Sequence, residues 1–207
     1  MKTLIAKYVR CLVLNALLLG VAETALAGAH TWDVNEVFSN ADGTVQFVEL
    51  REMGGGAGEV NMPGNNLTSN AKSFVIPGPA LTPPTSNKHF LLGTAAFQLL
   101  PGAPAVDATI PAGSLPFFFV PSGDTVTYGP YDSFVFASAP TNGIDSQNRV
   151  GGVAVNSPTN YAGATGSVDA SAGPSVPALS GWGMGLAAGL LLLVGTAIVL
   201  RSRARAA

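Results

Sequence analysis

Short apolar runs separated by turn residues dominate the middle of the chain. The first run, TWDVNEVF, is followed by the turn SNADGT and then by the alternating run VQFVELRE. Successive side chains of a strand point to opposite faces, so Val45 and Phe47 would share one face, and Val48 and Leu50 the other. Both faces of this strand are therefore partly apolar. The Asp-Gly pair in the turn favours a hairpin, because glycine accepts a positive φ at little cost.

Five later segments have the same character and predict further strands. They are SFVIP (73–77), KHFLLGT (88–94), LPFFFVP (115–121), DTVTYGP (124–130) and DSFVFAS (132–138). Prolines stand at their ends, where the missing N–H does not interrupt a ladder. No long segment between them has a helical period. The pattern predicts an all-β fold, a single immunoglobulin-like β-sandwich of two sheets over residues 28–156.

The two ends of the chain have a different character from the middle. A basic start, the apolar run CLVLNALLLGVA and the small residues Ala25 and Ala27 follow the order of a secretory signal peptide, predicted as residues 1–27. The apolar run is shorter than the about 20 residues that span a bilayer, which disfavours the alternative of an uncleaved anchor. Cys11, the only cysteine, would leave with this segment. The mature chain would then contain neither a disulfide nor a catalytic thiol.

Beyond residue 156 the composition shifts to Gly, Ala, Ser, Asn, Thr and Pro. Few large apolar groups are present to offset the entropy of ordering the chain, so residues 157–175 are predicted to be a flexible linker. Residues 182–200 then form an apolar stretch long enough to cross a membrane as one helix. Arg201, Arg203 and Arg205 follow and favour a cytoplasmic C-terminus. A buried core helix is the alternative, but it would end in three solvated arginines.

The tail also carries a specific motif. In VPALSGWGM, Pro177, Leu179, Trp182 and Gly183 stand where the IPTL-CTERM sorting signal of Gram-negative bacteria has them. Residues 176–207 resemble that tripartite signal, with valine and alanine in place of its usual isoleucine and threonine. The resemblance implies recognition and processing by an intramembrane sorting protease of the exosortase type. A simple membrane anchor is the alternative.

The first strand pair carries a second resemblance. The segments NEV (35–37) and FVEL (47–50) are similar to the opening of bacterial lamin-tail-like domains. This resemblance implies a lamin-tail-like β-sandwich. The Gly-Trp segment that such domains often have after the second strand is missing, and EMGGGAGE stands there instead. That glycine-rich stretch lacks the lysine and the strand-to-helix context of a phosphate loop, so we expect a flexible loop.

Charge and residue types exclude several functions. Residues 28–173 contain four basic and eleven acidic side chains, a net charge of −7. A surface of this sign repels phosphate backbones, which argues against nucleic-acid binding. The same segment contains only two histidines, His30 and His89, and no Gly-x-Ser-x-Gly elbow. For each histidine, a solvated or strand-edge position is a simpler interpretation than a catalytic role.

Acidic residues of the first hairpin provide the remaining candidate chemistry. Asp33, Glu36, Asp42 and Glu49 are candidates for a structural calcium site, because calcium binds several oxygens. Strand alternation would scatter them over both faces, so solvated or turn-capping carboxylates are the alternative. Glu36 and Glu49 would also suit the paired acids of a glycosidase, which lie about 5 to 10 Å apart. No row of tryptophans for stacking sugars accompanies them, and no cofactor is predicted.

Together these patterns predict a non-enzymatic exported protein. It would be sorted to or anchored at the cell envelope and act as a surface-displayed structural, adhesion or matrix module. Its expected partners are the sorting protease, the membrane through the C-terminal helix, and extracellular polysaccharide or matrix. The alternative is an envelope enzyme acting on polysaccharide, whose site the sequence does not locate.

Overall fold

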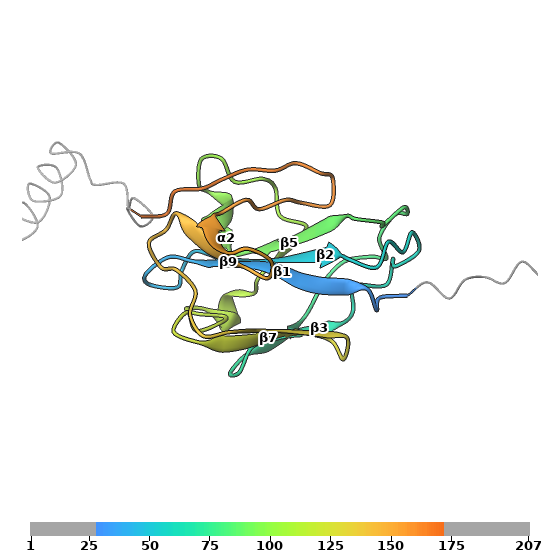
Figure 1. Ribbon diagram of the computed structural model, residues 1–207, viewed down its shortest axis with the longest axis horizontal. Helices are drawn as coiled ribbons and strands as arrows, with labels where there is room; N and C mark the ends of the chain where they lie inside the picture. Colours follow the sequence, from blue (N-terminus) through green and yellow to red (C-terminus); the bar gives the residue numbers. More distant parts are fainter. Residues whose placement is uncertain (1–27, 172–207) are drawn as a thin grey trace, which may run out of the picture. The chain divides into compact units, whose positions relative to one another are not determined.

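Two β-sheets packed face to face form the centre of the computed structural model, which describes residues 28–171 (Figure 1). One sheet has the order β10-β9-β1-β2-β5-β6 and the other β4-β3-β7-β8, and all pairs are antiparallel except β5 and β6. The all-β sandwich predicted from the sequence is confirmed. The elements are β1 (Trp32–Ser39), β2 (Gln46–Glu52), β3 (Asn66–Thr68), β4 (Ser73–Val75), β5 (His89–Gly93), α2 (Ala95–Gln98), β6 (Ala108–Thr109), η1 (Ala112–Ser114), β7 (Asp124–Tyr128), β8 (Asp132–Phe136), β9 (Asp145–Asn148) and β10 (Gly152–Val155).

The β1–β2 hairpin is the centre of the larger sheet. Gly43 takes a φ of 68° in its turn, so the predicted Asp-Gly turn is confirmed. Val48 and Leu50 face the smaller sheet and join the core between the two sheets. Trp32, at the start of β1, is completely buried there, and its indole N–H donates to the carbonyl of Glu59 at 2.8 Å.

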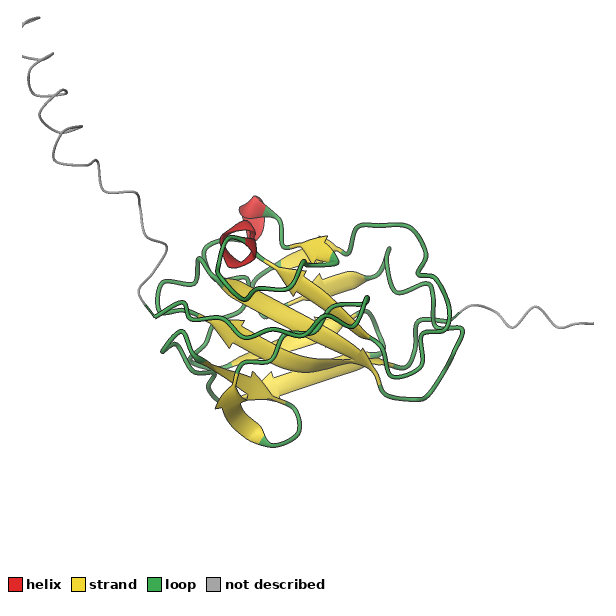
Figure 2. Cartoon of the chain, turned by 90° about the horizontal axis from the view of Figure 1, so that it is seen from above, coloured by secondary structure: helices red, strands yellow, loops and turns green. Residues whose placement is uncertain are grey.

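The opposite face of β2 is also buried, under a third layer. Phe47 stacks on Phe38 at 5.2 Å between ring centroids and meets Phe97 of α2 edge-on at 5.3 Å. Val168 and Ala170 complete this second cluster. The helix and long loop segments lie along the outer side of the larger sheet (Figure 2). This third layer explains why both faces of β2 are apolar.

Residues 157–171, here called the C-terminal strap, belong to this third layer. Val168 and Ala170 are 3% exposed, and the side chain of Asn156 donates to and accepts from the backbone of Val168 at 2.7 and 2.8 Å. The flexible linker predicted from residue 157 is therefore wrong for residues 157–171, and the folded domain extends to residue 171 rather than 156. The composition of this segment suggested disorder because it buries little apolar area, but hydrogen bonds to the rest of the domain also hold it in place.

The predicted strand at 115–121 is also wrong. Phe117 has a φ of 57°, which no strand allows, and the peptide bond before Pro116 is cis. The side chain of Gln46 replaces a neighbouring strand here: its oxygen accepts from the N–H of Phe118 at 2.7 Å, and its nitrogen donates to the carbonyl of Phe119 at 2.9 Å. The loop can therefore bury two phenylalanines without joining a ladder.

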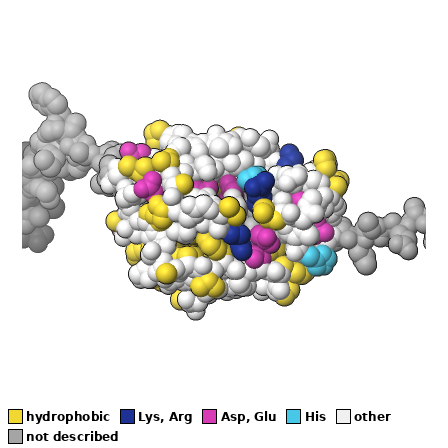
Figure 3. All heavy atoms as spheres, in the orientation of Figure 1, with side chains coloured by type: hydrophobic (Ala, Val, Ile, Leu, Met, Phe, Trp, Pro, Cys, Tyr) yellow, Lys and Arg dark blue, Asp and Glu magenta, His cyan; other side chains and the backbone are white. Residues whose placement is uncertain are grey.

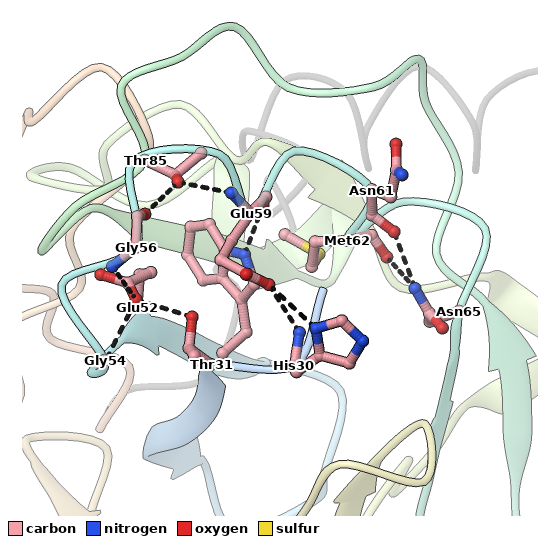
Figure 4. Close-up of polar contacts among 11 residues, drawn as sticks. His30, Thr31, Glu52, Gly54, Gly56, Glu59, Asn61, Met62, Asn65 and Thr85 are labelled. Atoms are coloured by element: carbon pink, nitrogen blue, oxygen red, sulfur yellow. Dashed lines mark hydrogen bonds and ion pairs between the residues drawn. The ribbon is translucent and has the colours of Figure 1, made fainter. Parts of the chain in front are cut away.

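Glu52 organises the glycine-rich loop after β2 (Figure 4). Its buried carboxylate accepts hydrogen bonds from the N–H groups of Gly54 and Gly56 at 3.0 and 2.9 Å, and from the hydroxyl of Thr31 at 2.7 Å. The N–H of Asn87 is a fourth donor, at 3.0 Å. Burial alone would raise the pKa of Glu52, but these donors outweigh it and hold the pKa below its usual value. The expectation of a flexible loop is therefore wrong.

An ion pair replaces strand pairing where β1 has a bulge, between Val34 and Glu36. Asp132 of β8 accepts the N–H of Val34 at 2.8 Å, and Arg149 donates to the carbonyl of Val34 at 2.6 Å. Asp132 and Arg149 also pair with each other. Because Asp132 belongs to the smaller sheet, this pair links the two sheets while satisfying the exposed edge of β1.

Two predictions concern residues beyond the described range. Within residues 28–171, no helix has both the length and the apolar character needed to cross a bilayer. The predicted span at 182–200 and the predicted signal peptide at 1–27 lie outside the described residues.

Truncation tests the domain boundary. We expect the fragment 28–156 to be less stable than the fragment 28–171 by on the order of 3 kcal/mol, because removal of the C-terminal strap exposes the aromatic cluster around Phe47. Urea unfolding followed by fluorescence suits the measurement, since Trp32 is the only tryptophan in both fragments. Equal unfolding midpoints would show that the strap does not belong to the folded domain.

A buried hydroxyl provides a test of the core. The Tyr128 hydroxyl has no hydrogen-bond partner within residues 28–171, whereas that of Tyr161 donates to the carbonyl of Thr82. An unpaired buried polar group costs about 1 to 3 kcal/mol. We therefore expect Tyr128→Phe to raise the free energy of unfolding by about 1 kcal/mol and Tyr161→Phe to lower it. Loss of stability in Tyr128→Phe, measured by urea unfolding, would reveal a partner for this hydroxyl.

Candidate functional site

Glu36 and Glu49, the predicted acid pair, lie side by side on the outer face of the larger sheet. They occupy directly opposed positions of β1 and β2, and each residue is 1% exposed. Two ionisable carboxyls rarely share a buried position unless hydrogen-bond donors surround them. The donors therefore decide what this pair can do.

Each carboxylate accepts from the C-terminal strap. The N–H of Ser157 donates to Glu36 at 3.0 Å, and its hydroxyl donates to the other oxygen at 3.2 Å. The N–H of Thr159 donates to Glu49 at 2.7 Å. Glu49 also contacts the side-chain amide of Asn35 at 2.7 Å and the Nδ1 atom of His89 at 2.8 Å.

A third carboxylate continues the pattern. Asp107, just before β6, accepts the N–H of Tyr161 at 2.9 Å and that of Leu91 at 2.8 Å. Glu36, Glu49 and Asp107 are here called the carboxylate row. Their donors from the strap are residues 157, 159 and 161, whose N–H groups point to the same side of an extended chain. The strap thus crosses neighbouring strands and is fixed at every second residue.

Burial shapes the electrostatics of this row. Burial raises the pKa of Glu36, and the nearby charge of Glu49 raises it further, while hydrogen bonds from Ser146 and Ser157 oppose the shift. Burial also raises the pKa of Asp107, in spite of its two N–H donors. Burial therefore works against ionisation of both groups, and the hydrogen bonds from the strap work in favour of it.

The geometry gives the carboxylate pair a structural role rather than room for a sugar. A glycosidase needs its two acids open to a glycosidic bond, and an inverting enzyme also needs space for a water molecule. In this domain, backbone and side-chain donors of the chain itself occupy oxygens of both Glu36 and Glu49. The strap covers the place that a substrate would need.

The four calcium candidates do not form one site. Glu36 and Glu49 are brought together, but Asp42 lies in the hairpin turn, where it accepts from the N–H and hydroxyl of Thr44 at 3.0 and 2.6 Å. Asp33 lies near the other end of β1, opposite Arg51. Within residues 28–171, no three acidic, histidine or cysteine side chains are grouped so as to hold a metal ion.

The histidines lie in separate places. His30 is exposed at the start of the domain, and Glu59 accepts its backbone N–H at 2.7 Å (Figure 4). His89 is half-buried in β5 beside Glu49. On the face seen in Figure 3, acidic and basic side chains lie close together, without one large patch of a single sign.

A small pocket lies next to the carboxylate row. Its volume is about 240 Å³, below the about 300 Å³ at which ligand pockets usually begin. Residues 77–82 form much of its wall, together with Phe90, Asp107 and Tyr161. One oxygen of Asp107 already accepts two backbone N–H groups. The carboxyl is therefore positioned to hold the fold rather than to react.

Sequence reasoning missed Asp107 and the strap residues of this site. No residue type in the strap marks it as part of the site, because the strap contributes backbone N–H groups, which every residue except proline carries. Only the period-two spacing of residues 157, 159 and 161 marks them, and it becomes visible once their acceptors are known.

Comparisons with protein families, with curated proteins and with solved structures find no match for this chain. The resemblances to a sorting signal and to lamin-tail-like domains therefore stay predictions. The interpretation of the site depends on its own geometry.

Substitution of Glu36 tests the role of the carboxylate row. Glutamine keeps an acceptor for the Ser157 N–H without a buried charge, so we expect Glu36→Gln to be more stable than the parent at pH 7. Because the folded-state pKa of Glu36 is raised, the folded parent binds a proton more tightly than the unfolded parent. The advantage of the variant should therefore shrink as the pH falls from 7 to 5.

Glu36→Ala is the matched control for this experiment. It removes the acceptor of the Ser157 N–H, and we expect a loss of about 1 to 3 kcal/mol at pH 7. Urea unfolding of both variants and the parent at pH 5 and pH 7 gives the comparison. A Glu36→Gln variant less stable than the parent at pH 7 would show that the charge itself is required.

Proposed function

We propose that this chain is a non-enzymatic exported protein whose β-sandwich is displayed at the cell envelope as a structural, adhesion or matrix module. The observation that carries the proposal is the closure of the carboxylate row by the strap. The acid pair that would serve an enzyme accepts hydrogen bonds from the chain's own backbone. The alternative of a polysaccharide-acting enzyme would need this pair to be open.

The positions of the domain ends support display. The first and last segments of the described chain lie at opposite ends of the domain in both ribbon views (Figures 1 and 2). The loop that directly follows β2, residues 53–64, lies toward the same end as the start of the domain (Figure 1).

The attachment of the strap supports anchoring through the C-terminus. The N–H of Ala170 donates to the carbonyl of Gly143 at 2.8 Å, one residue before the described range ends. Asn156 holds Val168 by two hydrogen bonds. A force on the following tail would thus act on a segment that is fastened at several points along the sheet. A module held by its C-terminal end benefits from such fastening.

The proposed route to the surface depends on the tail. Residues 176–207 would act as a sorting signal read by an exosortase-type intramembrane protease, with residues 182–200 as the membrane span. Pro177, Leu179, Trp182 and Gly183 would mark the processing site. Arg201, Arg203 and Arg205 would keep the C-terminus cytoplasmic before processing. Extracellular polysaccharide or matrix is the proposed environment of the mature domain.

Substitutions in the tail test this proposal in the native host. We expect Pro177→Ala to insert normally, since proline adds nothing to the apolar span, but to stay unprocessed. Changing the three arginines to glutamate should misplace the precursor, because the charge bias that sets orientation is lost. The measurement is the size and the membrane or surface fraction of the protein on a gel.

The matched control is Pro174→Ala, which changes a proline just outside the motif. It should mature like the parent. If Pro177→Ala also matures and reaches the surface like the parent, the tail is only an anchor and the sorting role is wrong.

A further inference from the structure

The edge strand β10 is unusually open. It forms one end of the six-stranded sheet, and its residues 152–155 read GVAV, without a charge or a proline. Val153 is 57% exposed and Val155 is 60% exposed. An exposed, uncharged apolar edge strand is a template for pairing with another strand.

The hydrogen-bond pattern shows which backbone groups are free. The N–H of Asn156 donates to the carbonyl of Ile144, so Asn156 faces β9 at this edge. Backbone groups alternate sides along a strand, and Ala154 and Gly152 therefore also face β9. The N–H and C=O groups of Val153 and Val155 point away from the sheet. They have no partner within residues 28–171.

The other sheet edges lack this combination. β6 has two residues and β4 has three, and short edges offer little to pair with. β8 begins with a charged residue, Asp132, and exposes one large apolar side chain, Val135, where β10 exposes two. Among the edges of the described domain, β10 alone is four residues long and uncharged.

We propose that β10 pairs with β10 of a second copy of this chain, antiparallel, about a two-fold axis through Ala154. In this register, Val153 of each copy lies opposite Val155 of the other copy. Both residues direct their N–H and C=O groups outward, so the two pairs exchange four hydrogen bonds. The two six-stranded sheets then become one continuous sheet.

The side chains favour the same register. Val153 and Val155 lie on one face of β10, so the axis brings four valines together there. Such β-branched cross-strand pairs stabilise the pairing of two strands. In a dimer with a two-fold axis, a charged residue near the axis lies beside the same charged residue of the second copy, which it repels. The neutral β10 is therefore the edge at which two domains of net charge −7 can approach.

A second copy satisfies the whole edge, because its own donors, acceptors and valines complement those of the first copy. The inference does not depend on how the tail is processed or on where the protein resides.

Cysteine cross-linking of the full chain tests the register. Opposed residues without mutual hydrogen bonds, such as the two Ala154 residues, have Cα atoms about 4.5 Å apart, which suits a disulfide. In a Cys11→Ser background, we expect Ala154→Cys to form oxidised dimers at least tenfold faster than Val135→Cys. Val135 is the matched control, since it is 71% exposed on β8. Equal rates for the two variants would overturn the proposal.

A second experiment removes the pairing without cysteines. The double change Val153→Lys and Val155→Lys places four like charges on the proposed seam, and both positions are exposed, so the fold should tolerate them. We expect the dimer dissociation constant of the full chain in detergent to rise at least tenfold, and that of Val135→Lys to stay unchanged. A monomeric parent, or a dimer that the double change leaves intact, would contradict the proposal.

Discussion

Carboxylate oxygens that accept backbone N–H groups from loops are the interaction on which this domain depends. Nine of the eleven acidic side chains between residues 28 and 171 accept at least one backbone N–H. They are Glu36, Asp42, Glu49, Glu52, Glu59, Asp107, Asp124, Asp132 and Asp169. Most of the acidic side chains of the domain therefore act as hydrogen-bond acceptors for the backbone, whether they are buried or exposed. Hydrogen bonds to charged groups are stronger than neutral ones, which lets short loops hold a defined shape.

This arrangement answers the main problem of the chain, which is how to stabilise many loops without a disulfide. Strands account for less than half of the residues between 28 and 171, and the loops between them leave backbone groups that sheets would otherwise pair. Glu52 accepts backbone N–H groups of the glycine-rich loop that no neighbouring strand pairs. Gln46 does the same for the loop at 117–119, and Asp132 for the unpaired edge at the start of β1. Buried polar side chains thus take the place of missing strands.

The same interaction bears on function. Glu36 and Glu49 resemble a catalytic pair in the sequence, but their position under the strap gives them a structural task. The strap closes the outer face of the larger sheet and carries the chain to residue 171. The closed acid pair is the observation that supports the proposed role in display. The one open, uncharged edge of four residues in the described domain is β10.

The sequence by itself determined the elements that depend on local pattern. Side-chain alternation and an Asp-Gly turn located the first hairpin, and short apolar runs bounded by turn residues located the strands at 73–75, 89–93, 124–128 and 132–136. The tertiary structure alone decided the conformation of the glycine-rich loop, the loop at 115–121 and the strap. Their order comes from backbone groups meeting side chains distant in the sequence, and Thr159 on Glu49 spans 110 residues. A backbone N–H is the same in almost every residue, so no local sequence pattern predicts which of them will donate to a distant carboxylate.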